Sequence, residues 1–415
     1  MTSPTPPPQL DDATIRKVIA EIEWLCQMGS LAEARGAAQA LADCIPGDPR
    51  GPAVLGIVLA KGKHMAAAVD PLGQAVRHFP KSTEVNFYHG LALYNVGRMA
   101  DAEAAFKAVL AINPREIHAL QNLGATLAAD GRPAEARAVF EQVLAIDANS
   151  ELAWLGVADS YRGIADREVR HAALERALAI NPDNRQARHM LDATLGRTPD
   201  HPDWRYVSEF FDAYADRFET HLVGALNYVG HSVLATMLRE AYPAQDRFPR
   251  VLDIGCGTGL LGAELVAHYR CRDLVGIDLS QRMLDAARSR GCYTDLKRAE
   301  ATAALKRDTT TYDLMAAADV LIYIGAVDQL FAACAARLND GGILAFSVES
   351  LDDDEDAPAG FMLRDNTRYG HRRDYLLDQA QTAGFRVVAE REGAIRRHGG
   401  RDEMGLYMIL EKTTG

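Results

Sequence analysis

Residues 250–265 read RVLDIGCGTGLLGAEL, and this stretch indicates the fold class of the second half of the chain. An apolar run of strand type leads into a glycine-rich turn, and a helical pattern follows the turn. Gly255, Gly257 and Gly259 carry no side chain, so the backbone of the turn can approach a ligand closely. The stretch predicts a strand–turn–helix unit that cradles a ligand at the carboxyl end of its strand.

Strands and helices alternate after this unit. The expected strands lie at 274–280, 312–318 and 340–350, and the expected helices at 280–290 and 327–338. Such alternation is typical of a doubly wound parallel sheet, whose ligands bind at the carboxyl ends of the strands.

The last strands break this alternation. A helix is predicted at 371–385, and two apolar runs follow at 385–391 and 404–412 with no helix between them. Consecutive strands without a crossover helix pair in the antiparallel sense. We therefore expect an antiparallel pair at the edge of the sheet.

Asp278 ends the second expected strand, nineteen residues beyond Gly259. A carboxylate there can accept hydrogen bonds from both hydroxyls of a ribose, so an adenosine-bearing coenzyme is implied. Residues 257–262 also satisfy the GxGxxG pattern of dinucleotide-binding folds, which is a weak motif on its own. The earlier Asp253, the extra Gly255 and the paired strands of the tail favour a different coenzyme.

The first half of the chain repeats itself every 34 residues. A short motif that usually ends in proline recurs at Pro46, Pro80, Pro114, Ala148 and Pro182. In the same register, small residues recur where two antiparallel helices would touch; they are Gly56, Gly90, Gly124 and Ala158 at one position and Ala34, Ala68, Ala102 and Ala136 at another. This period is that of the tetratricopeptide repeat. The first and fifth repeats depart from the pattern, with Ile22 and Arg170 at these positions, as terminal repeats often do.

The predicted organisation has four parts. Residues 1–14 form a disordered leader, and residues 15–195 form the helical repeats with a capping helix at 184–195. Residues 196–204 contain two prolines and a glycine and form a linker. Residues 205–415 form the α/β domain. The fold class is thus multidomain, an all-α solenoid followed by a Rossmann-like sheet. We expect the solenoid surface to bind a protein partner, with a spacer or a homodimer arm as the alternative.

Residues 205–413 resemble a class I S-adenosylmethionine-dependent methyltransferase. VLDIGCGTG at 251–259 matches the first motif of that family, and GIDLS at 276–280 matches the second. The resemblance implies a seven-stranded sheet with an inserted antiparallel strand, and S-adenosyl-L-methionine as the coenzyme. The whole chain resembles bacterial predicted methyltransferases that carry tetratricopeptide repeats, and its second half is similar to the methyltransferase-like protein of the Williams–Beuren region.

The resemblance implies roles for individual residues in coenzyme binding. Gly255 and Gly257 would line the methionine part, and Asp253 would help to hold its amino group; a turn-capping role for Asp253 is the alternative. Asp278 would hold the ribose. Met283 would lie against the adenine, with a plain core role as the alternative.

Three further positions follow from the same resemblance. The family usually shows Ala-Asp where this chain has Ala299 and Glu300. Glu300 would accept a hydrogen bond from the adenine amino group, and a solvated carboxylate at a helix start is the alternative. Asp319 and Val320 would face the sulfonium and the acceptor. The predicted coenzyme site is completed by Cys256, Gly259 and Leu279.

Methyl transfer is an in-line displacement at the methyl carbon, so the protein mainly aligns the acceptor and excludes water. A general base is needed only when the acceptor must lose a proton. His371 is the candidate base, with a structural, helix-capping histidine as the alternative. Tyr214 and Tyr323 are candidate catalytic residues that would form walls of the acceptor pocket.

The composition limits the partners and the compartment. The chain has 45 basic and 57 acidic residues and a net charge of −12, so we expect no nucleic-acid binding and no binding to anionic membranes. Six cysteines without a CxxC pair indicate reduced thiols. No apolar run reaches the ~18 residues of a membrane span, and the first residues do not form a signal peptide. We therefore expect a cytoplasmic protein.

An acidic run spans residues 352–356. Without a histidine or further carboxylates at suitable spacing it is interpreted as a solvated loop rather than a metal site, and no metal is expected. Its charge would favour a cationic acceptor.

Three functions remain open at this point. The first is methyl transfer to a small molecule, with the repeats serving a partner or a dimer. The second is methylation of a protein or peptide that the repeat groove recruits. The third is a scaffold that binds the coenzyme without turnover, and a dehydrogenase is a distant fourth.

Overall fold

The computed structural model describes residues 10–163, 166–219, 222, 224, 227–352, 355–398 and 401–414. Contacts divide the chain into two compact units, Met1–Tyr161 and Arg162–Gly415. Residues 1–9 of the predicted leader, and Asp353 and Asp354 of the acidic run, lie outside the described residues. Helix α1 (Asp12–Gln27) begins inside the predicted leader, because Asp11 accepts a hydrogen bond from the Thr14 amide as its N-cap.

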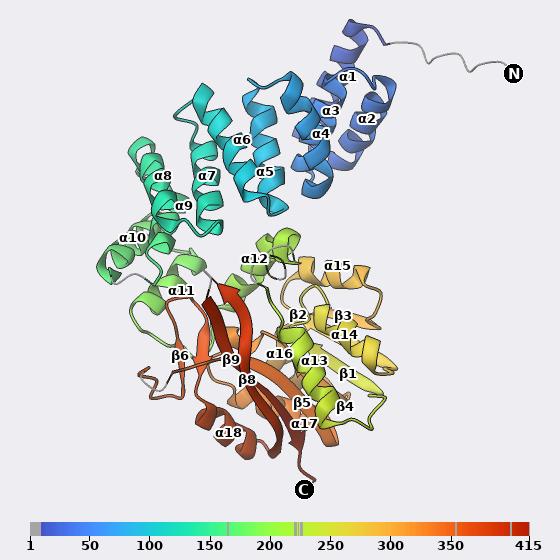
Figure 1. Ribbon diagram of the computed structural model, residues 1–415, viewed down its shortest axis with the longest axis vertical. Coiled ribbons are helices and arrows are strands. Elements are labelled where there is room, and N and C mark those ends of the chain that lie inside the picture. Colours follow the sequence, from blue (N-terminus) through green and yellow to red (C-terminus); the bar gives the residue numbers. More distant parts are fainter. Residues whose placement is uncertain are drawn as a thin grey trace, which may run out of the picture. The chain divides into compact units, whose positions relative to one another are not determined.

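The first unit is built from pairs of helices (Figure 1). Those that follow α1 are α2 (Leu31–Cys44), α3 (Arg50–Lys61), α4 (Met65–His78), α5 (Thr83–Asn95), α6 (Met99–Ile112), α7 (Ile117–Ala129), α8 (Pro133–Ile146) and α9 (Glu151–Ser160). A Cβ atom on Gly90 of α5 would lie 2.7 Å from the Phe106 ring of α6, and one on Gly124 of α7 would lie 2.8 Å from the Phe140 ring of α8. The small residues therefore let paired helices approach closely, and the helical-repeat prediction is confirmed.

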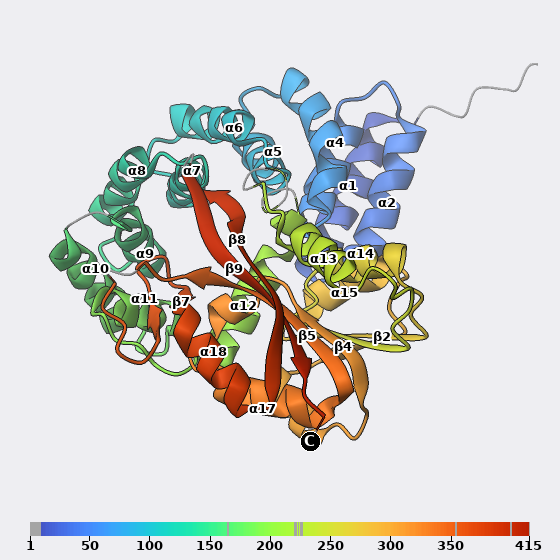
Figure 2. The ribbon, with the colours of Figure 1, turned by 60° about the horizontal axis from the view of Figure 1, so that its bottom comes forward.

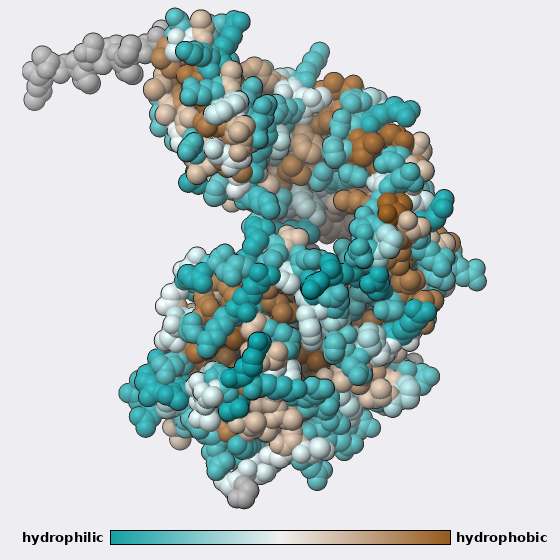
Figure 3. All heavy atoms as spheres, turned by 180° about the vertical axis from the view of Figure 1, so that it is seen from behind, coloured by the Kyte–Doolittle hydropathy of each residue, from teal (hydrophilic) through white to brown (hydrophobic). Residues whose placement is uncertain are grey.

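The outer surface of the repeats is mixed in polarity. Figure 3 shows brown hydrophobic residues lying among teal hydrophilic ones over the repeat helices. Trp24, Met28, Ile112 and Leu152 are exposed apolar side chains of this unit. Scattered exposed apolar residues are normal on soluble surfaces. Among the described residues, no helix is both long and apolar enough to cross a membrane.

The second unit begins with helices α10 (Arg167–Ile180) and α11 (Arg185–Thr194), the second helix of the fifth repeat and the predicted capping helix. The compact boundary thus lies between Tyr161 and Arg162 and not at 196–204. Arg170 is 1% exposed and donates to the carbonyl oxygen of Asp365 at 3.0 Å. These two helices therefore pack with the sheet that follows them.

Nine strands form one sheet in the described part of this unit (Figure 2). They are β1 (Arg250–Ile254), β2 (Asp273–Asp278), β3 (Asp295–Arg298), β4 (Tyr312–Ala317), β5 (Leu338–Ser350), β6 (Phe361–Leu363), β7 (Tyr369–His371), β8 (Phe385–His398) and β9 (Arg401–Lys412). The order is β3-β2-β1-β4-β5-β7-β6, and β1 to β5 pair in parallel along it. Strand β9 pairs antiparallel with both β5 and β8, which confirms the predicted antiparallel pair.

Helices cover both faces of this sheet (Figure 2). Helices α13 (Gly230–Ala241) and α14 (Leu260–His268) pack on one face, and α16 (Ala301–Arg307), α17 (Asp328–Arg337) and α18 (Arg373–Thr382) pack on the other. Successive strand residues point to opposite faces, so Val251 and Leu252 of β1 belong to different cores. The continuous apolar runs of the sequence follow from burial on both faces.

Candidate functional site

The glycine turn lies at the carboxyl end of β1. Gly255, Gly257 and Gly259 have φ angles of 61°, 53° and 88°, which L side chains rarely adopt. A Cβ atom on Gly255 would lie 2.5 Å from Val320, so that position needs glycine for packing. A Cβ atom on Gly257 would meet nothing nearer than the Phe218 ring at 3.9 Å. The turn is thus a backbone cradle with open space above Gly257.

Asp278 stands beside this cradle at the end of β2. Its carboxylate accepts hydrogen bonds from the Gly257 amide at 2.9 Å and the Ser280 amide at 2.8 Å. Burial raises the pKa of Asp278, and these two amide hydrogen bonds oppose the rise. Each carboxylate oxygen has lone pairs to spare for a ribose hydroxyl. The donor set and the open cradle therefore fit an adenosine-bearing coenzyme.

Asp253 lies beneath the turn and is 1% exposed. Its carboxyl group accepts a hydrogen bond of 2.7 Å from the Tyr293 hydroxyl. Burial raises the pKa of Asp253 to about 7, although the Tyr293 hydrogen bond lowers it. Its predicted contact with the coenzyme amino group stays a prediction.

Tyr293 is a site residue that the sequence reasoning missed. Its ring fills the space left by Gly259, Gly262 and Gly276, because a Cβ atom at 259 would lie 2.9 Å from the ring, one at 276 would lie 3.0 Å away, and one at 262 would overlap it. Gly262 lies inside helix α14 and Gly276 inside strand β2, where glycine is unfavourable. In the sequence, a glycine inside a helix and another inside a strand were therefore the features that could have indicated a bulky side chain packed against them.

A helix that precedes the sheet packs against the residues that follow Asp278. Helix α12 (Trp204–Tyr214) and η1 (Ala215–Arg217) contact helix α15 (Gln281–Ser289), which follows β2. Asp212 of α12 accepts hydrogen bonds from the Ser280 hydroxyl at 2.5 Å and the Arg282 amide at 3.3 Å. Arg282 in turn donates to the Asp212 carbonyl oxygen at 2.9 Å. Helix α12 is thus held at the residues that follow Asp278.

Two predicted pocket residues, Tyr214 and Tyr323, belong to one cluster of aromatic rings. The Tyr323 ring lies 5.2 Å from Phe211, and the Tyr214 ring lies 5.3 Å from Phe218, with both pairs edge to face. Phe211 and Phe218 are also neighbours, at 6.3 Å. Burial raises the pKa of both tyrosines, so they remain protonated and able to donate a hydrogen bond. The structure thus places Tyr214 and Tyr323 in one aromatic cluster, whose Phe218 ring borders the cradle at Gly257.

Asp319 follows β4 and has a φ of 61°, which is uncommon for a residue with a side chain. Its amide donates to the Ser347 hydroxyl at 2.9 Å. Arg396 of β8 donates to both carboxylate oxygens of Asp319, at 2.7 and 3.1 Å. The next residue, Val320, packs on Gly255. Asp319 therefore lies beside the cradle with its carboxylate bound by an arginine that the sequence reasoning did not assign to the site.

Four other predicted coenzyme residues have these surroundings. Leu279 follows Asp278, and its carbonyl oxygen accepts from the Ser208 hydroxyl at 3.1 Å. Cys256 and Met283 are buried. Glu300 is the N-cap of α16, and its carboxylate accepts the amides of Thr302 at 2.8 Å and Ala303 at 2.7 Å. Adenine contacts by Met283 and Glu300 stay predictions.

His371 lies in β7 and is 1% exposed. Its Nε2 is 2.9 Å from the carbonyl oxygen of Gly325, and its Nδ1 has no partner among the described residues. Burial lowers the pKa of His371 to about 4, although the Gly325 contact raises it. The imidazole is thus neutral near pH 7 and weakly basic. Its assignment as a general base stays a prediction.

Comparison with known proteins identifies the two kinds of domain. Residues 252–344 match the methyltransferase domain family, and residues 54–117 and 89–151 match the tetratricopeptide repeat family. A biotin biosynthesis bifunctional protein BioCD of Bordetella avium is 38% identical over 92 residues, which are 22% of this chain and 19% of that protein. A ubiquinone biosynthesis O-methyltransferase of Coxiella burnetii is 29% identical over 101 residues, or 24% of this chain and 42% of that protein. The chain therefore spans less than half the length of these relatives.

A solved structure of an S-adenosylmethionine-dependent methyltransferase from Clostridium acetobutylicum is 18% identical, with a TM-score of 0.37. The alignment covers 48% of this chain and 97% of that one. The two family matches fall on the helix pairs of the first unit and on the sheet that carries the glycine turn. The chain carries tetratricopeptide repeats followed in sequence by a methyltransferase domain.

Proposed function

We propose that the second unit transfers a methyl group from S-adenosyl-L-methionine to an acceptor. The observation that carries the proposal is the open cradle at Gly257 with the Asp278 carboxylate beside it. The carboxylate is fixed by two amides and keeps lone pairs for two hydroxyls, which is the requirement for holding a ribose.

When bound, the coenzyme supplies a methyl group on a positively charged sulfur. Asp278 would hold the ribose, and the backbone at Gly255 and Gly257 would contact the methionine part. Helix α12 would exclude water, and the aromatic residues on and beside it, including Tyr214 and Tyr323, would bound the space in which the acceptor lies. Alignment of acceptor and methyl group is then the main contribution to the rate.

Proton removal by His371 has little support from its environment. A base with a pKa of about 4 has a small driving force for taking a proton from a hydroxyl or an ammonium group. We infer that the chemistry relies on positioning and that His371 supports the end of β5, whose Ser350 it faces in the sheet.

Asp278→Ala tests the coenzyme assignment. The substitution removes charge-assisted hydrogen bonds to the ribose, so affinity for S-adenosylhomocysteine should fall by about 1.5–3 kcal/mol, or about 10- to 150-fold. Isothermal titration calorimetry measures the affinity. Asp273→Ala, at the opposite end of the same strand, is the control and should bind as the wild type does.

Asp278→Asn removes the charge but keeps the shape of the side chain. It therefore separates the loss of ribose binding from a collapse of the turn, which the alanine variant alone does not separate. Equal affinity in the wild type and both Asp278 variants would show that the ribose is held elsewhere.

The repeats support a second candidate, methylation of a recruited protein. Tetratricopeptide repeats present an extended surface to partners, and this chain has them before the methyltransferase domain. We further propose that the repeats bind a partner or form a homodimer and that the protein is cytoplasmic. A scaffold that binds the coenzyme without turnover is the alternative function. A methylated product from any acceptor would exclude the scaffold.

A further inference from the structure

Helix α12 and the η1 turn that continues it lie beside helix α15 (Figure 1). Three polar residues of this segment are spaced four apart, so they lie on one of its faces; they are Ser208, Asp212 and Asp216. They bind three residues that come directly after β2, which are Leu279, Ser280 and Arg282. The polar face of the segment is therefore attached just after Asp278, the residue that we assign to the ribose.

The hydroxyl group of Ser280 is bonded on both sides. Ser280 is fully buried and is the N-cap of α15, where its oxygen accepts the Met283 amide at 3.1 Å. A hydroxyl has a single proton to donate, and this one is donated to Oδ1 of Asp212 at 2.5 Å. Ser280 is thus fixed between helix α15 and helix α12.

The backbone of Ser280 in turn fixes the Asp278 carboxylate. The Ser280 amide donates to one oxygen at 2.8 Å, and the Gly257 amide donates to the other at 2.9 Å. A chain of contacts therefore runs from Asp212 through Ser280 to Asp278 and on to the glycine turn. The orientation of the Asp278 carboxylate depends on the place of residue 280, which Asp212 holds.

The charge of Asp212 does not itself favour an ionised Asp278. Burial is the main cause that raises the pKa of Asp278, and the nearby Asp212 carboxylate raises it further. An ionised carboxylate accepts stronger hydrogen bonds than a neutral one. A benefit of Asp212 for ribose binding must therefore come from its hydrogen bond to Ser280 and not from its charge.

The same segment also reaches the glycine turn. Arg282 donates to the Asp212 carbonyl oxygen at 2.9 Å and to the Asp216 carboxylate, so both α12 and η1 are held at α15. Phe218 follows η1 directly, and its ring would lie 3.9 Å from a Cβ atom on Gly257. The segment thus borders the predicted coenzyme site at Gly257 as well as behind Asp278.

We propose that Asp212 is a positioning residue for the coenzyme, which holds the Asp278 carboxylate through Ser280 in the orientation that accepts the ribose hydroxyls. The proposal rests on the coenzyme-binding function proposed above. Asp212 acts through its neighbours and does not itself contact the coenzyme. A carboxylate that is already oriented loses less conformational freedom on binding, so loss of Asp212 should weaken binding.

Titration calorimetry of the full-length chain with S-adenosylhomocysteine tests the proposal. Asp212→Ala removes the acceptor of the Ser280 hydroxyl, and affinity should fall about three- to tenfold. Asp212→Asn keeps an acceptor oxygen and removes only the charge, so it should bind within about twofold of the wild type. Glu209→Ala is the matched control on the same helix, since Glu209 is 64% exposed, and it should bind as the wild type does.

Ser280→Gly is a second variant that breaks the same contact. Glycine is accepted at an N-cap at little cost, so α15 should persist while the hydroxyl is lost. Affinity should again fall about three- to tenfold. Thermal unfolding of each variant shows that it is folded at the temperature of the titration.

A double-mutant cycle shows whether Asp212 acts through Asp278. Effects of residues that act as a unit are not additive. Asp212→Ala should therefore change the affinity of the Asp278→Ala variant by less than about twofold. A general loosening of α12 would instead weaken binding by the same factor in both backgrounds, which would overturn the proposal.

The remaining outcomes separate this proposal from the proposed function. Weaker binding by Asp278→Ala, with wild-type affinity in Asp212→Ala and Ser280→Gly, would reject the positioning role alone. Binding by Asp212→Asn as weak as that by Asp212→Ala would also reject it, because the charge would then be the cause. A wild-type chain that does not bind S-adenosylhomocysteine would reject the coenzyme assignment and this proposal with it.

Discussion

Asp253 is a residue whose protonation should affect the stability of the fold. Burial raises its pKa from 3.8 to about 7, so the folded chain keeps a proton that the unfolded chain loses. This stabilising contribution is fully present below about pH 4 and is lost as the pH rises through about 7. Asp253→Asn should therefore gain stability over the wild type between pH 4 and pH 8, by up to about 4 kcal/mol.

Urea unfolding of the coenzyme-free protein across this pH range measures the effect. Asp273→Asn, at the other end of the neighbouring strand, controls for the loss of a negative charge. Parallel stability curves for Asp253→Asn and the wild type would contradict the environment described for Asp253.

The sequence was informative about residues close to the glycine motif and uninformative about their distant neighbours. Spacing alone predicted that Asp278 lies beside the turn, because adjacent parallel strands end at one edge. Tyr293 and Arg396 were missed since they reach Asp253 and Asp319 from segments 40 and 77 residues away. No local pattern encodes such contacts, although the glycines at 262 and 276 left room for Tyr293.

At the scale of elements, helix α10 holds the turn between β6 and β7. Arg170 stands where other repeats have alanine, and its buried guanidinium donates to the Asp365 carbonyl oxygen at 3.0 Å. His189 of α11 contacts the Thr367 carbonyl oxygen at 3.0 Å. The departure of Arg170 from the repeat pattern thus has a structural reason in this turn between β6 and β7.

Arg170→Ala should destabilise the second unit by about 1–3 kcal/mol, because it leaves buried polar groups of the turn without a donor. Hydrogen exchange at residues 361–371 should also become faster. Arg167→Ala is the matched control, since Arg167 contacts the same Asp365 at 3.3 Å but is 62% exposed, and it should change stability by less than about 1 kcal/mol. Similar effects of the two substitutions would refute the role given to Arg170.

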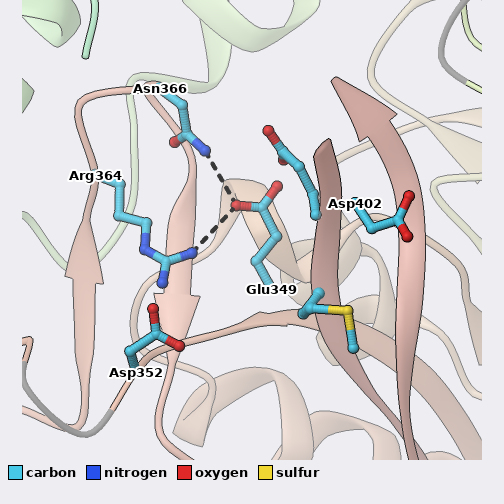
Figure 4. Close-up of a pocket in the computed structure, with 7 residues that line it drawn as sticks. Glu349, Asp352, Arg364, Asn366 and Asp402 are labelled. Carbon is cyan, nitrogen blue, oxygen red and sulfur yellow. Dashed lines mark hydrogen bonds and ion pairs between the residues drawn. The ribbon is translucent and has the colours of Figure 1, made fainter. Parts of the chain in front are cut away.

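Strongly patterned elements were predictable and short ones were not. The 34-residue repeat in the sequence predicted the helix pairs. The absence of a helical pattern between the last two apolar runs predicted the antiparallel pairing of β8 and β9. Strands β6 and β7 have three residues each, too few for an alternation to stand out in the sequence. Their hairpin nevertheless carries Arg364 and Asn366, which contact the buried Glu349 of β5 at 3.8 and 3.2 Å (Figure 4).

At the scale of the whole molecule, the compact boundary determines where the chain can be cut. A chain that starts at Arg162 keeps α10 and α11, and one that starts at Gly196 loses Arg170 and His189. The first should fold and bind S-adenosylhomocysteine with nearly full affinity, and the second should be less stable. Thermal unfolding and calorimetry compare the two, and equal stability would place the boundary after α11.

The chain that starts at Arg162 also separates the two acceptor hypotheses. The truncated chain should still methylate a small-molecule acceptor. Its kcat/KM should fall if the acceptor is a protein that the repeats recruit.

Transfer of a labelled methyl group tests the central claim most directly. The full-length chain is incubated with methyl-labelled S-adenosyl-L-methionine and with cell extract fractions or defined amine-containing acceptors, beside Asp278→Ala and Asp273→Ala. The account predicts labelled product with the wild type and Asp273→Ala, and far less with Asp278→Ala at a limiting coenzyme concentration. Absence of labelled product from every acceptor, by a chain that still binds S-adenosylhomocysteine, would contradict methyl transfer and leave a coenzyme-binding scaffold.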